Sequence, residues 1–241
     1  MGNIGAFFDI DGTIYREGLI TEVFKKLIKY ELVDPMRWHA EVKPKYIRWD
    51  KRIGDYDDYL LGMVDIYKET LTGLYKNQIE FIAKKVIDQK GDRVYTYTRD
   101  RIDWHKKNNH KLIAISGSPI EIVREMSKKY GIDVYRGSIY VLDENGIYTG
   151  DIIPMWDSKS KEKAMKDIAK DYDIDLSLSY AYGDTSGDFS MFKLVGNPIC
   201  INPTKELLKK VIEDEVNDRI KIIVERKDVV YTMNTDCVDF K

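Results

Sequence analysis

The chain has 241 residues, of which 43% are hydrophobic, so it can build one sizeable domain or a core domain with an insert. Its 39 basic and 41 acidic residues leave a net charge of −2, and no apolar run reaches membrane-spanning length, which argues against nucleic acid or a membrane as partner. Two distant cysteines and three histidines without metal-ligand spacing argue against a disulfide framework and a structural zinc site, and the lack of a signal peptide indicates a cytoplasmic protein.

Five short apolar runs have the composition of β-strands. The first, residues 4–8, is apolar at successive positions rather than at alternate ones, which is typical of a strand covered on both faces. Strand and helix patterns alternate along the chain, and this order predicts an α/β fold with a parallel sheet and right-handed crossovers. The other predicted strands are residues 111–115, 132–136, 178–182 and 198–201.

The segment after the first strand has a different character, because it contains helical patterns and no convincing strand. Apolar side chains recur three and four positions apart in three stretches, residues 20–28, 59–71 and 79–87. The sequence therefore predicts a helical domain of residues 15–91, inserted into a core domain of residues 1–14 and 92–241.

A helix with clear end signals follows the second predicted strand. Ser118 is a candidate N-cap, Pro119 suits the first helical position, and Glu121 completes an S-x-x-E capping box. Gly131 then stands where the helix should end.

Two further features belong to the predicted sheet domain. Asn145 and Gly146 lie between apolar stretches and predict a tight β-hairpin turn. The stretch after Pro203 is expected to add a helix and an edge strand, and it carries no recognisable motif.

Residues 36–52 mix basic with aromatic side chains. Such a stretch could recognise an anionic ligand or stack on a base. More often it forms a solvated face with aromatic rings packed inward, and we favour this interpretation. The residues concerned are Arg37, His39, Lys43, Lys45, Arg48 and Arg52, together with Trp38, Tyr46 and Trp49.

Polar side chains follow three of the predicted strands at the point where each strand ends. Asp9 and Asp11 come after the first strand, residues 116–118 after the second, and residues 183–188 after the fourth. Two carboxylates at the tip of a buried strand repel each other unless a metal ion or a chemical role offsets that cost. Because the carboxyl ends of parallel strands share one edge of a sheet, these segments should meet in one crevice.

The motifs D-I-D-G-T, I-S-G-S, a lysine that opens a helix, and G-D-x-x-x-D occur in this order between about residues 7 and 191. Together they resemble the haloacid dehalogenase-like hydrolase superfamily, and the helical insert resembles its phosphoserine phosphatase-like subgroup, subfamily IB. The resemblance implies a Rossmann-like three-layer α/β/α core with a parallel sheet and an inserted helical cap of the C1 type.

The resemblance also implies a chemistry for the acidic residues. Asp9 would be the nucleophile that forms an aspartyl-phosphate, and Asp11 would act as general acid and base. A Mg²⁺ ion would offset the repulsion between carboxylate and phosphate. The side chains of Asp9 and Asp184 and the backbone carbonyl of Asp11 would bind this ion, while Asp188 would orient a metal-bound water from outside the ligand set.

Other residues are expected to bind the phosphate group. Gly12 would let the backbone approach the phosphate, and Ser116 would hold its oxygens together with nearby N–H groups. A lysine of residues 158–170 would face the transferring phosphoryl group; helical phase favours Lys161, with Lys159 as runner-up and Lys163 as the third choice. The residues assigned to phosphate or substrate are Gly12, Thr13, Ser116, Gly117 and Lys161.

These expectations describe a Mg²⁺-dependent phosphatase that acts on a small phosphorylated metabolite. A phosphotransferase or phosphomutase would use the same intermediate, and a non-catalytic binding protein could share the scaffold. Phosphoserine is a doubtful substrate, because Met63 stands near the position where that subgroup carries an arginine and Gly187 replaces a customary asparagine. Glu17 or Glu22 could take the place of the glutamate that grips the amino acid.

Overall fold

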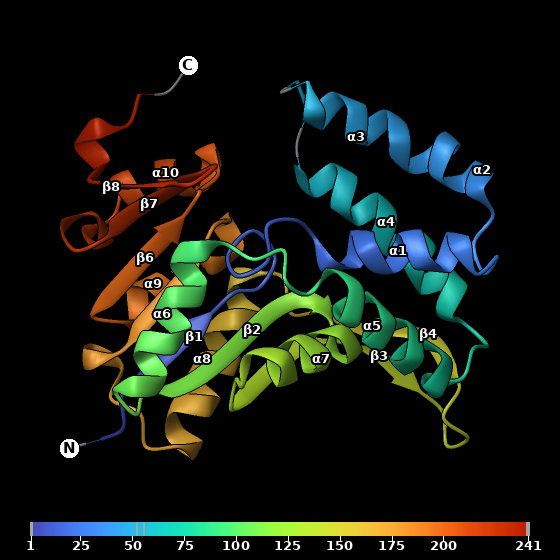
Figure 1. Cartoon of the computed structure of the whole chain (residues 1–241), viewed down its shortest axis with the longest axis horizontal. Helices are drawn as coiled ribbons and strands as arrows, with labels where there is room; N and C mark the ends of the chain where they lie inside the picture. The colour runs from blue at the N-terminus through green and yellow to red at the C-terminus, as the bar shows by residue number, and fades with distance from the viewer. Residues whose placement is uncertain (1, 52, 55, 240–241) are drawn as a thin grey trace.

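A computed structural model describes residues 2–51, 53–54 and 56–239. The strands are β1 (Gly5–Phe8), β2 (Lys111–Pro119), β3 (Val134–Leu142), β4 (Tyr148–Ile153), β5 (Tyr180–Gly183), β6 (Asn197–Ile201), β7 (Lys221–Arg226) and β8 (Val229–Met233). They form one eight-stranded sheet in the order β4-β3-β2-β1-β5-β6-β7-β8 (Figure 1). All inner strands run parallel to one another, and only the edge strands β4 and β8 are antiparallel to their neighbours.

Helices cover both faces of the sheet. Side chains on β1 alternate between two cores, with Phe8 in the core under α6 (Thr96–Lys107) and α7 (Ile120–Tyr130) and Phe7 in the opposite core. The opposite core is covered by α8 (Ser158–Asp171), α9 (Phe189–Leu194) and α10 (Lys205–Ile212). The predicted three-layer α/β/α architecture is therefore confirmed. No helix in the described part of the chain is both long and apolar enough to cross a membrane.

The region between β1 and α6 is helical, as expected, and its described residues form no strand. Its elements are α1 (Leu19–Lys29), α2 (Pro35–Arg37), a π-helical segment (Trp38–Val42), α3 (Lys43–Asp50), α4 (Tyr56–Leu71) and α5 (Lys76–Lys90). In Figure 1, α1 to α4 form a group at the upper right of the view, and α5 lies beside α7. The boundaries of a separate cap domain remain a prediction.

The turn between α4 and α5 is hydrogen-bonded to the hairpin of β3 and β4. Backbone N–H groups of Gly73 and Lys76 donate to the carbonyls of Tyr148 and Gly146, each at 3.0 Å, and Tyr148 N–H donates to the Leu74 carbonyl at 3.0 Å. This end of the helical region is thus joined to the sheet by main-chain hydrogen bonds.

The expected capping box of α7 is wrong. Ser118 belongs to β2, and Pro119 occupies the N-cap position without a side-chain cap. The Ser118 hydroxyl instead donates a hydrogen bond to Asp11 at 2.6 Å, so it is not available to the helix. The C-terminal signal is confirmed, because Gly131 ends α7 in the left-handed conformation with φ of 62°.

The predicted hairpin is confirmed, whereas the C-terminal stretch adds more to the sheet than expected. Gly146 has φ of 77° in the turn that joins the antiparallel strands β3 and β4. After α10 the chain forms two strands rather than one: β7 pairs in parallel with β6, and only β8 is an edge strand. The third and fourth predicted strands begin two residues later than expected, at Val134 and Tyr180.

The basic and aromatic stretch has its rings turned inward, as favoured from the sequence. Trp38, Tyr46 and Trp49 pack against the core, and the Arg37 guanidinium pairs with the carboxylates of Glu41 and Glu69. Its last basic residue, Arg52, lies outside the described residues.

Glu225 on the C-terminal strand β7 contacts the start of α6 and the Arg16 side chain, which precedes α1. Glu225 on β7 is buried, and its carboxylate accepts hydrogen bonds from the backbone N–H groups of Thr96 and Tyr97 at 3.0 and 2.8 Å. It also pairs with Arg16 at 3.0 Å. A carboxylate at the first turn of α6 satisfies N–H groups that have no partner within the helix.

We expect Glu225→Ala to lower the free energy of unfolding by about 2 kcal/mol, because it leaves the N–H groups of Thr96 and Tyr97 without their partner and removes the ion pair with Arg16. Chemical denaturation measures this, with Glu144→Ala in the exposed hairpin turn as the control. An equal effect of the two substitutions would contradict this account of β7.

Candidate active site

The sequence-predicted site residues meet at the carboxyl ends of β2, β1 and β5, which are neighbours in the sheet. Asp9 and Asp184 directly follow β1 and β5, whereas Ser116 and Gly117 belong to the last residues of β2. The residues brought together are Asp9, Asp11, Gly12, Thr13, Ser116, Gly117, Lys161, Asp184 and Asp188.

Lys161 is a buried cation between two carboxylates. Its Nζ lies 2.7 Å from Asp9 Oδ1 and 2.6 Å from Asp188 Oδ1. It stands in the first turn of α8, whose N-terminus is capped by the Asp157 carboxylate, which accepts a hydrogen bond from Ser160 N–H at 2.9 Å. Lys159 and Lys163 are exposed on the same helix, so only Lys161 of the three reaches the crevice.

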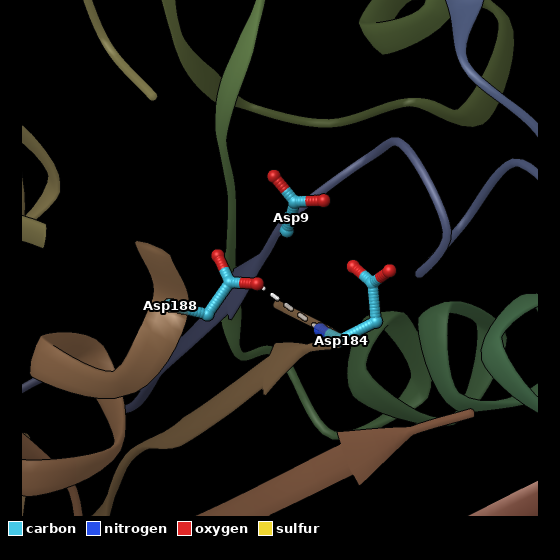
Figure 2. Close-up of side chains that lie close together, drawn as sticks. All are labelled: Asp9, Asp184 and Asp188. Atoms are coloured by element: carbon cyan, nitrogen blue, oxygen red, sulfur yellow. Dashed lines mark hydrogen bonds between the residues drawn. The ribbon is translucent and has the colours of Figure 1, made fainter. Parts of the chain in front are cut away.

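Three carboxylates converge beside this lysine. Asp9, Asp184 and Asp188 each offer an oxygen within 4.8 Å of the others, and Figure 2 shows the three side chains gathered around one space. Burial raises the pKa of Asp9 to about 8; the ion pair with Lys161 opposes this rise, and the charge of Asp188 adds to it. Burial and the nearby charges of Asp9 and Asp188 also raise the pKa of Asp184.

The three carboxylates differ in how many of their oxygens accept a hydrogen bond or an ion pair. Asp188 uses both, since Oδ1 pairs with Lys161 and Oδ2 accepts from the N–H groups of Asp184 and Thr185 at 3.0 and 3.1 Å (Figure 2). Among the described residues, by contrast, no hydrogen bond reaches Oδ2 of Asp9 or Oδ2 of Asp184. Two free carboxylate oxygens in a buried, net negative site suit a hard divalent cation.

Gly12 leaves space for the Asp184 side chain, and Thr13 forms a hydrogen bond with it. Gly12 has φ of 78°, and a Cβ on it would lie 2.0 Å from Asp184 Oδ2, so glycine is needed for both conformation and space. The Thr13 hydroxyl donates to Asp184 Oδ1 at 3.1 Å. The assignment of both residues to the phosphate stays a prediction; in the structure the Thr13 side chain contacts a carboxylate.

The carboxyl group of Asp11 is held on both oxygens. Oδ1 accepts from the N–H of Leu19, the first residue of α1, at 2.6 Å. Oδ2 accepts from the hydroxyls of Ser118 and Ser116, at 2.6 and 3.2 Å. Burial raises the pKa of Asp11, which brings it closer to the range where a carboxyl group can exchange protons at neutral pH.

Sequence reasoning missed two contributors to the site. Serine followed by proline and glutamate predicts a helix cap at Ser118, whereas its hydroxyl binds Asp11 in the structure. Trp156 carried no signal, yet a Cβ on Gly117 would lie 2.8 Å from its Cβ, and one on Gly187 would lie 2.4 Å from its carbonyl oxygen. Trp156 therefore leaves no room for a side chain at position 187.

Comparisons with known proteins show which family the sequence resembles. Residues 6–193 match the model of the haloacid dehalogenase-like hydrolase family. The chain is 24% identical to the "Inhibition of morphological differentiation protein" of Streptomyces azureus, over 86% of this chain and 74% of that one. It is 25% identical to a histidinol-phosphatase of Neisseria meningitidis serogroup C, over 86% of this chain and 94% of that one.

A solved structure shares the fold. A phosphoserine phosphatase with an analogue of its phospho-aspartyl intermediate superposes with a TM-score of 0.61 at 21% identity, covering 95% of this chain and 96% of that one. The family match spans the strands β1, β2 and β5 and the helix α8 that carry the acidic residues and Lys161. The chain belongs to the haloacid dehalogenase-like hydrolase family.

Proposed function

We propose that this protein is a Mg²⁺-dependent phosphatase that hydrolyses a small phosphate monoester through an aspartyl-phosphate on Asp9. The observation that carries the proposal is the contact of Lys161 with Asp9 at 2.7 Å and with Asp188 at 2.6 Å, beside the carboxylate of Asp184. A buried lysine beside an acid with a free oxygen is the arrangement that a carboxylate nucleophile needs to receive a phosphoryl group.

The reaction has two steps with opposite proton transfers at Asp11. First, an oxygen of Asp9 attacks phosphorus, the ester P–O bond breaks, and the protonated Asp11 gives its proton to the leaving oxygen. A water then attacks phosphorus and gives its proton to Asp11, the bond between Asp9 and phosphorus breaks, and inorganic phosphate leaves. The hydrogen bonds that fix the Asp11 carboxyl group hold it in place for both transfers.

Asp9 and Asp184 would hold the Mg²⁺ through their carboxylates, together with the backbone carbonyl of Asp11. When bound, the ion would supply the positive charge that offsets repulsion between the phosphate and these acids. Asp188 would fix Lys161 and the Asp184 backbone from outside the ligand set. Phosphate oxygens would be bound by Lys161 and by groups of Gly12, Thr13, Ser116 and Gly117.

Residues 15–91 would act as a cap over this crevice and determine the substrate. The cap lacks an arginine at the position where phosphoserine phosphatases are expected to bind the amino acid. Met63 stands there instead; it is fully buried, and its sulfur lies 3.8 Å from the Thr21 hydroxyl. Glu17 pairs with Arg93 at 2.6 Å, and Glu22 pairs with Lys25 at 2.8 Å. These pairings support a small phosphorylated metabolite other than phosphoserine.

We expect Asp9→Asn to lower the rate of phosphate release from p-nitrophenyl phosphate by about a thousandfold or more, because an amide cannot serve as the nucleophile. Steady-state assays with Mg²⁺ measure this. Asp171→Asn, at the exposed far end of α8, is the matched control and should retain full activity. Wild-type rates in the Asp9 variant would rule out the mechanism.

We also expect Mg²⁺ to stabilise the fold more at about pH 8 than at about pH 5.5. Because the pKa of Asp9 is raised in the folded protein, the metal-free fold keeps a proton that the unfolded chain has released, and its stability falls as pH rises from about 4 to about 8. A bound Mg²⁺ offsets the repulsion among Asp9, Asp184 and Asp188 when they are ionised. At the lower pH it must compete with protons for the same oxygens.

Thermal unfolding with Mg²⁺ or with EDTA measures this difference, which should reach about 5 °C at the higher pH. Asp184→Asn removes a ligand and should abolish the Mg²⁺ effect. A shift of equal size at both pH values, or one retained in this variant, would contradict Mg²⁺ binding at these carboxylates.

A further inference from the structure

A pocket of about 430 Å³ lies at the edge of the sheet opposite to the candidate active site. Its lining comes largely from the segments that lead into β1, β2 and β3, and the amino ends of these parallel strands share that edge. In Figure 1 this edge lies at the lower left, where α6 ends and β2 begins. The volume is sufficient for a small metabolite, and none of the candidate active-site residues is among the described residues that line it.

A buried chain of hydrogen bonds leads from the interior of the protein to this pocket. Arg101 Nε donates to the Tyr182 hydroxyl at 3.2 Å, and this hydroxyl lies 2.8 Å from His105 Nε2. His105 Nδ1 lies 2.7 Å from Nδ1 of His110, which lines the pocket. Tyr182 and His105 are fully buried, so each of their protons needs an acceptor within the chain.

The direction of the chain follows from Arg101, because a guanidinium group can only donate. The Tyr182 hydroxyl accepts from Arg101, and the acceptor for its own proton is His105 Nε2. Burial and the nearby Arg101 guanidinium lower the pKa of His105 to about 3, so this ring is neutral and carries its one proton on Nδ1. His105 therefore donates to His110 Nδ1. Burial lowers the pKa of His110 as well, and its own proton is left on Nε2, which no described residue binds.

Two lysines add positive charge to the pocket. Lys106 lies in the last turn of α6, and its Nζ lies 3.1 Å from the position that a Cβ on Gly131 would take. Lys111 begins β2, and its Nζ lies 4.9 Å from the centre of the Tyr172 ring. Among the described residues, neither ammonium group has a carboxylate within ion-pair distance. A lysine at the end of a helix offsets the helix dipole, which explains Lys106 but not Lys111.

Two features of the pocket disfavour an anion, but neither outweighs the lysines. Asp133 lines the pocket, and its Oδ2 accepts a hydrogen bond from Leu112 N–H at 2.8 Å, so one carboxylate is set against two ammonium groups. Helices α6 and α7 also end at this edge, where their carbonyls carry partial negative charge. The N–H of His110 donates to a carbonyl in the last turn of α6 at 3.0 Å, and the N–H of Ile132 does so for α7 at 2.9 Å.

The three donors belong to one tight connection. Only residues 108–110 separate α6 from β2, and His110 and Lys111 are adjacent in the chain. The lysine stems are flexible, so both ammonium groups can reach a ligand that accepts a hydrogen bond from His110 Nε2–H.

We propose that this pocket is a second ligand site, which binds a phosphate group through Lys106, Lys111 and the Nε2–H of His110. The group belongs to a phosphorylated metabolite or to free phosphate, which offer the same oxygens. A phosphate presents three oxygens and about two negative charges to these donors, whereas a carboxylate presents two oxygens and one charge. The proposal is independent of the phosphatase function, because the pocket and the crevice lie at opposite edges of the sheet.

Nitrogen-15 NMR of the histidine rings tests the site without any assay of activity, because the chain contains only His39, His105 and His110. Near neutral pH we expect the proton of His110 on Nε2 and that of His105 on Nδ1. Inorganic phosphate, added at constant ionic strength with EDTA present, should shift the His110 Nε2 signal to saturation with a Kd of about 1 mM or lower, while His39 should not respond. A proton on His110 Nδ1 in the free protein, or no saturable shift, would overturn the proposal.

Lys106→Gln and Lys111→Gln should each raise this Kd by about fivefold or more, because each removes one charged donor. Lys107→Gln is the matched control: Lys107 is an exposed neighbour at the end of α6 that is not among the residues lining the pocket, and this variant should keep the wild-type Kd. Equal weakening in all three variants would indicate a general attraction to positive charge and would contradict a defined site.

Benzylphosphonate and acetate separate the possible ligands. A phosphonate keeps the tetrahedral oxygens and carries no ester bond to hydrolyse, so tighter binding of benzylphosphonate than of phosphate would identify a phosphorylated metabolite as the ligand. Tighter binding of phosphate would identify the free ion, and both outcomes support the proposal. Acetate bound as tightly as phosphate would refute the preference for a phosphate group and with it the proposal.

Discussion

The structure of the crevice depends on one buried ion-pair network, in which Lys161 lies between Asp9 and Asp188. Two carboxylates this close would repel each other in a buried site, and the lysine at the start of α8 offsets that cost. One lysine does not neutralise Asp9, Asp184 and Asp188 together. The remaining negative charge is the physical reason why a divalent cation suits the site.

Close backbone packing brings these groups within reach of one another. Gly12 leaves space for Asp184, and Gly117 and Gly187 leave space for Trp156. A Cβ at any of these positions would lie within 2.8 Å of another atom. The glycines of the motifs therefore shape the site through what they leave empty, in addition to any contact that their N–H groups make with a phosphate.

The helical region is linked to the reaction centre through Asp11. The first N–H of α1 binds one oxygen of this carboxyl group, and two serines of β2 bind the other. A movement of α1 would alter the position of the proposed general acid. At its other end the same region is joined to the β3–β4 hairpin by main-chain hydrogen bonds.

Sequence patterns alone predicted the α/β sheet, the helical region after β1, and the placement of the acidic motifs at one sheet edge. They could do so because the periodicity of apolar residues and the alternation of strands and helices along the chain are visible in the sequence itself. Helical phase also favoured Lys161 over Lys159 and Lys163, since only one face of α8 can point at the sheet. The tertiary structure decided the partners of those groups. Ser118 binds Asp11 rather than capping α7, Thr13 binds Asp184, and Glu225 reaches α6 from a C-terminal strand without a motif. Such contacts join residues far apart in the chain, and only the packed fold determines which donor meets which acceptor.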